Sequence, residues 1–187
     1  MARNRLFQTR KHQIKKEELG LNEWMTPPWL LEKIYKIFPS GFDIDVASPV
    51  GIDTAVKASH CFTHVENGLE QSWDGFPIIW CNPPYNDIES FVRKAFLEME
   101  ITTDTDKMIL MLIPSFIDFN YWHDLIFPKS SIIFFRGRIT FRNPDETRRH
   151  QYHANALVIL DSGTDWCREK RNQLRDEFSE HSFISAG

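Results

Sequence analysis

Residues 107–115 read KMILMLIPS, and the six consecutive side chains from Met108 to Ile113 are all large and apolar. The side chains of a strand point alternately to the two faces of its sheet. A strand of this composition is therefore stable only when both faces are covered. The run predicts a central strand in a sheet that carries helices on both faces.

The segments around this run alternate between helical and strand-like spacing. Apolar residues recur at helical spacing in residues 27–38 and 87–100, and Thr26 and Pro27 suit the N-cap and first position of the earlier helix. Other patterns predict strands at 42–49, 60–65, 78–81, 130–141 and 154–161, a turn at Asn67-Gly68, and helices at 119–127 and 165–178. Strands separated by helices predict an α/β fold with a mostly parallel sheet and an antiparallel hairpin near the C-terminal end.

Length and charge suggest how the chain is divided. With 187 residues, 42% of them hydrophobic, and no apolar run near 18 residues, we expect one globular domain without a membrane span. Residues 1–16 contain six Lys or Arg and no acid, which leaves 16 basic and 26 acidic residues in the rest. We therefore expect a basic, flexible arm at 1–20, a domain at 21–161 and a charged tail at 162–187.

The cysteines and the N-terminal composition indicate a compartment. The three cysteines are scattered and form no CxxC pair, which favours a reducing cytoplasm; they are Cys61, Cys81 and Cys167. The basic N-terminal segment lacks the apolar stretch of a secretory signal.

The stretch IIWCNPPYND, residues 78–87, places an amide between a short apolar strand and two prolines. Pro83 disfavours a helical conformation at Asn82, and both Pro83 and Pro84 have a fixed φ angle and no N–H group. The sequence therefore predicts a rigid turn at the end of a strand. That turn presents the Asn82 amide, a backbone carbonyl and the ring of Tyr85.

The NPPY sequence is similar to the [DNS]-P-P-[YFW] motif of amino-methyltransferases that use S-adenosylmethionine. A wider set of segments, in the same order along the chain, resembles the phage-type Dam family of DNA adenine-N6 methyltransferases. These segments are NEWMTPPWLLEKI (22–34), FDIDVASP (42–49), CFTHVENGLEQSW (61–73), IIWCNPPY (78–85), MLIPS (111–115), FFRGRITF (134–141) and NALVIL (155–160). The resemblance implies a single Rossmann-like methyltransferase domain, encoded by a phage or prophage, that acts on double-stranded DNA in the cytoplasm of a bacterial host.

The chemistry of adenine methylation explains the residue types in this turn. The N6 lone pair of adenine is delocalised into the ring, so methyl transfer requires a shift of that nitrogen toward tetrahedral geometry. Two acceptors aimed at its hydrogens favour this shift, and Asn82 and the Pro83 carbonyl can supply them. Pro84 keeps the turn stiff, and Tyr85 can stack on a base that has left the duplex.

The resemblance also implies a site for S-adenosylmethionine, whose product is S-adenosylhomocysteine. Thr26 and Pro27 would lie near the methionine end, and the strand and loop from Asp43 to Ser48 would form the floor. DIDVASPVG lacks the GxG of the wider superfamily, although small residues still permit close backbone approach. Glu66 is the first candidate for the ribose hydroxyls, and Asp53 the second. The expected cofactor-binding residues are Trp24, Thr26, Pro27, Asp43, Asp45, Ala47, Ser48 and Glu66.

Five arginines lie close together in the sequence between residues 136 and 149 and could bind DNA phosphates and base edges. They are Arg136, Arg138, Arg142, Arg148 and Arg149. A solvated, Arg-rich turn is the alternative reading of this segment.

Other functions remain open from sequence alone. The NPPY turn also occurs in methyltransferases that act on protein glutamine or on RNA, and the missing GxG leaves room for a silent DNA-binding remnant. We expect no metal site, because His60, Cys61 and His64 lack a second pair of ligands. His123 and Asp124 are more simply explained as part of a surface helix. The oligomeric state cannot be deduced from the sequence.

Overall fold

The apolar run at 107–115 forms β4 (Met108–Pro114), which is buried along its whole length. It pairs in parallel with β3 on one side and antiparallel with β8 on the other. The computed structural model describes residues 25–49, 56–101, 105–142, 149–150 and 153–185. The prediction of a central, doubly covered strand is confirmed.

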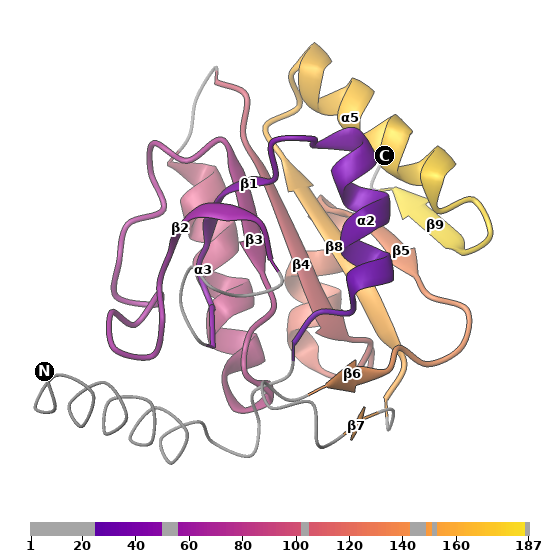
Figure 1. The fold of residues 1–187 in the computed structure, drawn as a ribbon, viewed down its shortest axis with the longest axis horizontal. Coiled ribbons are helices and arrows are strands. Elements are labelled where there is room, and N and C mark those ends of the chain that lie inside the picture. The colour runs from indigo at the N-terminus through magenta and orange to yellow at the C-terminus, as the bar shows by residue number, and fades with distance from the viewer. Residues whose placement is uncertain (1–24, 50–55, 102–104, 143–148, 151–152, 186–187) are drawn as a thin grey trace, which may run out of the picture.

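One seven-stranded sheet has the order β2-β1-β3-β4-β8-β5-β9 (Figure 1). The pairings make β2, β1, β3, β4 and β5 run in one direction, whereas β8 and β9 run in the other. The other six strands are β1 (Phe42–Asp45), β2 (Ala58–Cys61), β3 (Ile78–Cys81), β5 (Ser131–Phe134), β8 (Asn155–Asp161) and β9 (Ser182–Ser185). A separate two-stranded ribbon consists of β6 (Phe141–Arg142) and β7 (Arg149–His150).

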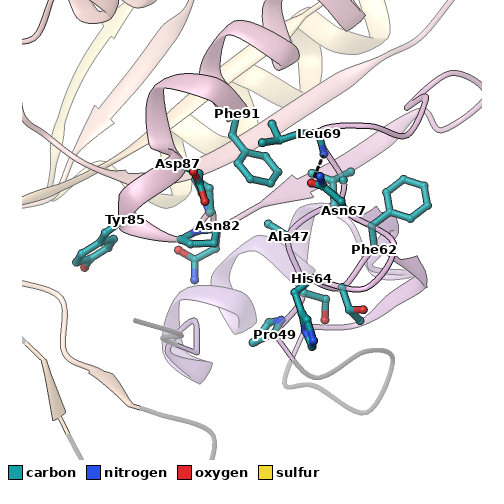
Figure 2. Close-up of a pocket in the computed structure, with 16 residues that line it drawn as sticks. Ala47, Pro49, Phe62, His64, Asn67, Leu69, Asn82, Tyr85, Asp87 and Phe91 are labelled. Atoms are coloured by element: carbon teal, nitrogen blue, oxygen red, sulfur yellow. Dashed lines mark hydrogen bonds between the residues drawn. The ribbon is translucent and has the colours of Figure 1, made fainter. Parts of the chain in front are cut away.

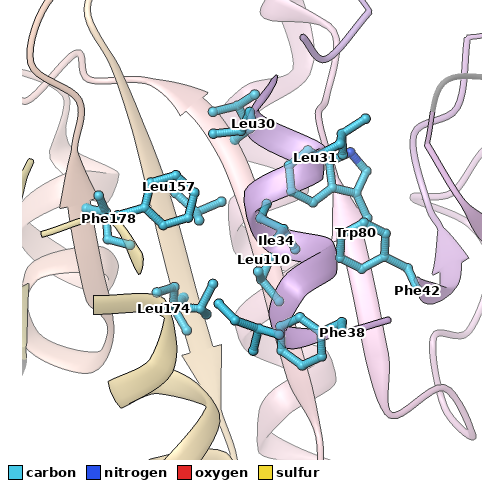
Figure 3. Packing of buried hydrophobic residues seen from close by; sticks show 14 of the residues in the cluster. Leu30, Leu31, Ile34, Phe38, Phe42, Trp80, Leu110, Leu157, Leu174 and Phe178 are labelled. Atoms are coloured by element: carbon cyan, nitrogen blue, oxygen red, sulfur yellow. The ribbon is translucent and has the colours of Figure 1, made fainter. Parts of the chain in front are cut away.

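Helices cover both faces of the sheet, and each face has its own apolar cluster. On one face, α2 (Pro28–Ile37) and α5 (Asp165–Glu177) bury residues such as Leu31 and Leu174 against Trp80 and Leu110 (Figure 3). On the other face, α3 (Ile88–Glu100), the π-helix η2 (Trp122–Ile126) and α4 (Phe127–Lys129) lie over the sheet. Neighbouring residues of β3 therefore belong to different clusters, as expected for a strand buried on both faces.

Three predicted elements differ from the structure. Thr26 is not the N-cap of α2; Pro27 holds that position, without a side-chain cap. The strand expected at 130–141 ends at Phe134, and Gly137 then adopts a positive φ of 83° before β6 begins. The strand expected at 60–65 lies earlier, at 58–61.

The segment after residue 162 packs against the sheet through two elements. Helix α5 was expected there, and Thr164 caps it by accepting a hydrogen bond from the Cys167 N–H. Strand β9 was not predicted, and it pairs antiparallel with β5 at one edge of the sheet. The four residues of β9 are too few for a clear alternation of apolar and polar side chains.

The loop after β2 lies very close to the end of β1. A Cβ atom at Gly68 would be only 2.0 Å from the carbonyl oxygen of Val46, and this loop also contains the predicted turn that starts at Asn67. The buried indole of Trp73 donates a hydrogen bond of 2.8 Å to the Gly68 carbonyl. Glycine is thus required at this contact, although the sequence has no GxG after the first strand.

We predict that Gly68→Ala destabilises the fold by about 3 kcal/mol, because neither backbone can move away from the new methyl group. Urea denaturation would measure the loss. Gly75→Ala is the matched control, since Gly75 also follows this loop but has no atom within 4 Å of the added Cβ. Its positive φ of 77° should cost only about 1 kcal/mol. Equal losses for the two variants would contradict the close contact.

Candidate functional site

A cavity of about 240 Å³ lies beyond the carboxyl ends of β1, β2 and β3 (Figure 2). In the sheet β2 lies on one side of β1 and β3 on the other, so the chain changes direction of winding at this point. Ligands of open α/β sheets bind at such a switch point. The wall residues are Val46–Pro49, Phe62–His64, Asn67–Leu69, Asn82–Tyr85, Asp87 and Phe91.

Asn82 follows the last residue of β3 and is half-buried. Its amide nitrogen donates a hydrogen bond of 3.4 Å to the hydroxyl of Thr26, which is itself buried. Thr26 therefore connects the first motif to the NPPY turn instead of capping a helix. In Figure 2 the Asn82 side chain lies between Tyr85 on one side and Ala47 and His64 on the other.

Tyr85 begins the short helix η1 (Tyr85–Asp87) and is largely buried. Burial raises the pKa of its phenol to about 12, so the ring stays neutral at physiological pH. The ring meets His153 edge-on at 6.0 Å between centroids, and His153 meets Phe116 at 4.7 Å. Tyr85 is thus part of a row of packed rings rather than a loose surface cap.

The side of the cavity opposite Tyr85 is built by the ends of β1 and β2. The Ser48 N–H donates to the Phe62 carbonyl and the Phe62 N–H to the Asp45 carbonyl, which holds the two loops together. Ala47 and Ser48, both predicted site residues, line this side. Sequence reasoning missed Phe62, Asn67, Leu69, Asp87 and Phe91, for which the only local signal was the turn at Asn67-Gly68.

The predicted carboxylates do not line the cavity. Asp43 accepts a hydrogen bond of 2.8 Å from the Ile78 N–H, at the start of β3. Glu66 is exposed and accepts hydrogen bonds from the N–H and hydroxyl of Thr63, which lower its pKa. Pro27 and Thr26 lie outside the wall as well, and Trp24 and Asp53 fall outside the described residues.

Asp45 is buried beneath the floor of the cavity. Register places it beside Trp80, on the face of the sheet that α2 covers. Its Oδ1 atom accepts a hydrogen bond of 3.1 Å from the Ala47 N–H, so it fixes the turn that enters the cavity wall. Burial raises its pKa to about 7, because the charged form is poorly solvated there.

Three of the predicted arginines lie at the same edge of the sheet as the cavity. Arg136 and Arg138 are exposed in the loop after the carboxyl end of β5, and Arg142 is exposed on β6. The Met25 N–H donates to the Arg142 carbonyl at 2.7 Å, which joins this segment to the residue before Thr26. Arg148 falls outside the described residues, and only the backbone of Arg149, paired with Arg142, is described.

The other polar candidates have structural contacts. The His123 ring lies 2.8 Å from the Ile117 carbonyl, and the His60 ring packs against Phe76. In the described ranges, no group of three His, Cys, Asp or Glu side chains could hold a metal ion. None of the described helices is long and apolar enough to cross a bilayer.

The fold and the cavity define an α/β protein that binds a ligand at the carboxyl edge of its sheet. Residues 11–177 match the family described as DNA N-6-adenine-methyltransferase (Dam). A relative named DNA N-6-adenine-methyltransferase, from Haemophilus phage HP1 (strain HP1c1), is 27% identical over 135 residues, which cover 71% of this chain and 72% of the relative. No solved structure matches the chain. The chain belongs to the Dam family of DNA N-6-adenine-methyltransferases.

We predict that Asp45→Asn stabilises the protein at alkaline pH. The raised pKa means that ionised Asp45 opposes folding; this penalty is absent below pH 4, grows between pH 4 and 7, and is complete above pH 7. Asparagine keeps the acceptor for Ala47 but carries no charge. The gain at pH 8 should reach at most about 4 kcal/mol and should vanish near pH 4. Thermal unfolding across this range would measure it, and a gain that does not change with pH would contradict the assignment.

Proposed function

We propose that the chain transfers a methyl group from S-adenosylmethionine to N6 of an adenine in double-stranded DNA. The observation that carries the proposal is the Asn82-Pro83 turn beside a cavity at the switch point of the sheet, in a member of a DNA adenine methyltransferase family. The alternating order of strands and helices supports a Rossmann-like description of the domain. The phage origin of the relative supports a phage or prophage gene acting in a bacterial cytoplasm.

The residues on the β1–β2 side of the cavity fit S-adenosylmethionine. Ala47 and Ser48 are small enough for close approach, and Phe62 and Leu69 offer apolar surface for an adenine ring. Gly68 lets the β2 loop close over the end of β1, which is the part a GxG loop would otherwise have. Thr26, Pro27 and Trp24 remain candidates for the methionine end. Asp45 acts by holding the Ala47 turn, and Asp43 and Glu66 would act through the loops they brace.

When bound, S-adenosylmethionine supplies an electrophilic methyl group. The contribution of the chain is to orient the N6 lone pair toward it. The Asn82 side-chain oxygen and the Pro83 carbonyl accept hydrogen bonds from the two N6 hydrogens, which favours tetrahedral geometry at that nitrogen. The bond from the Asn82 amide nitrogen to Thr26 orients the amide and leaves its oxygen on the other side. The proton that N6 loses after transfer can pass to water, so no strong base is required.

Adenine N6 can reach this turn only when the base leaves the duplex. Tyr85 then offers the face on which the base stacks, and its neutral phenol suits a water-poor pocket. The exposed Arg136, Arg138 and Arg142 lie at the same edge of the sheet and are positioned to bind the flanking phosphates.

We predict that Asn82→Ala lowers kcat by at least ~100-fold, because one of two preorganised acceptors is removed. Transfer of labelled methyl groups to unmethylated DNA would measure it, and calorimetry should show nearly unchanged binding of S-adenosylmethionine. Asn86→Ala is the matched control, since Asn86 is exposed in the next turn and does not line the cavity. Turnover by Asn82→Ala equal to that of the control would refute the role of Asn82.

Two results with the wild-type protein would point to other functions. Absence of S-adenosylmethionine binding would indicate a silent DNA-binding protein. Binding without N6-methyladenine in digested DNA would indicate a different amine, on RNA or on protein glutamine.

We predict that Arg136→Gln and Arg138→Gln together weaken DNA binding and make the slope of log K against log salt shallower. The slope should fall by about 0.9 for each DNA phosphate that the protein no longer neutralises. Fluorescence anisotropy over a range of salt concentrations would measure both effects. Arg168→Gln is the control, because Arg168 is exposed near the start of α5 and bonds to Asp165. An unchanged salt slope in the double variant would exclude these arginines from the DNA interface.

A further inference from the structure

Asn155 is an unusual residue for its position. It opens β8, whose next five residues are all apolar and buried, and it is itself only 2% exposed. Asn is depleted in strands, and a buried amide costs free energy unless it has hydrogen-bond partners. The function of this side chain is therefore to be sought in what it faces.

The register of the sheet puts Asn155 at the edge that carries the cavity. Asn155 pairs with Pro114, the last residue of β4, while Cys81 pairs with Met111 on the opposite side of β4. Because strands are about 4.8 Å apart, Asn155 lies about 10 Å across the sheet from the end of β3. The NPPY turn crosses the end of β4 and brings Tyr85 into this space.

The side chains of Asn155 and Tyr85 act on each other. Asn155 lowers the pKa of the Tyr85 phenol, against the larger effect of burial. Within the described part of the chain, the Nδ2 atom of Asn155 completes no hydrogen bond of normal length. Its donor is therefore close to the phenol oxygen and is otherwise unused. His153, two residues earlier, contacts the same ring edge-on.

We propose that Asn155 is a positioning residue that acts through Tyr85. Its Nδ2 group donates to the phenol oxygen and, together with the His153 contact, fixes the plane of the ring on which the target adenine stacks. The proposal rests on the proposed function and adds a residue outside the cavity wall to the machinery that receives the base. A tyrosine held from the strand behind it loses less rotational freedom when the base arrives.

The test is a double-mutant cycle with Asn155→Leu, which keeps the volume but removes the amide, and Tyr85→Phe, which removes the phenol oxygen. We expect Asn155→Leu to lower kcat/KM for DNA about 3- to 10-fold, the effect of one hydrogen bond. In the Tyr85→Phe background the same change should have little further effect. The KM for S-adenosylmethionine should stay unchanged, since Asn155 does not line the cavity.

Ser131→Ala is the matched control for removal of a buried polar group in the sheet. Ser131 is also buried, bonds to Ser185 at the other side of β5, and does not line the cavity. Its kcat/KM should equal that of the wild type.

A parallel cycle on urea unfolding separates this inference from the proposed function, because it needs neither DNA nor cofactor. Asn155→Leu and Tyr85→Phe should be coupled by the equivalent of a 3- to 10-fold change in the unfolding constant. Additive effects on unfolding would overturn the contact, and additive effects on kcat/KM would overturn the positioning role. A wild-type protein that transfers no methyl group would instead overturn the proposed function, and the positioning role with it.

Discussion

The burial of β4 on both faces is the constraint on which the rest of the structure depends. Six large apolar side chains in a row cannot face water, so helices must pack on both sides of the sheet. The crossovers that place those helices make β1, β2, β3 and β4 parallel, and their carboxyl ends meet at one edge. The cavity, the NPPY turn and three arginines all lie at that edge because of this topology, although they are far apart in the sequence.

Stiffness at the site comes from backbone chemistry and a few long-range contacts. Two prolines fix the turn after β3, and the bond from Asn82 to Thr26 orients the amide. On the other side, the close approach of Gly68 to Val46 joins the loops of β1 and β2, and Asp45 braces the Ala47 turn from below. The cavity is thus largely formed without a ligand, which favours preorganised electrostatic stabilisation over rearrangement during the reaction.

The sequence predicted the features that depend on local periodicity and on proline. The strand at β4, helices α2, α3 and α5, and the turn after Cys81 follow from such patterns. The sequence could not show which face of β1 each residue occupies, so it did not reveal that Asp45 lies beneath the cavity. It also could not reveal contacts between distant segments. Thr26 has the composition of a helix cap, and only the folded chain shows that it pairs with Asn82.

A structure of the protein with DNA that contains its target adenine and with S-adenosylhomocysteine would test the central claim most directly. The account predicts an extrahelical adenine whose N6 lies within about 3 Å of both the Asn82 side-chain oxygen and the Pro83 carbonyl, a normal hydrogen-bond distance. The product cofactor should lie against Ala47 and Ser48. An adenine that remains stacked in the duplex, or a base bound away from the NPPY turn while the cofactor occupies another surface, would contradict it.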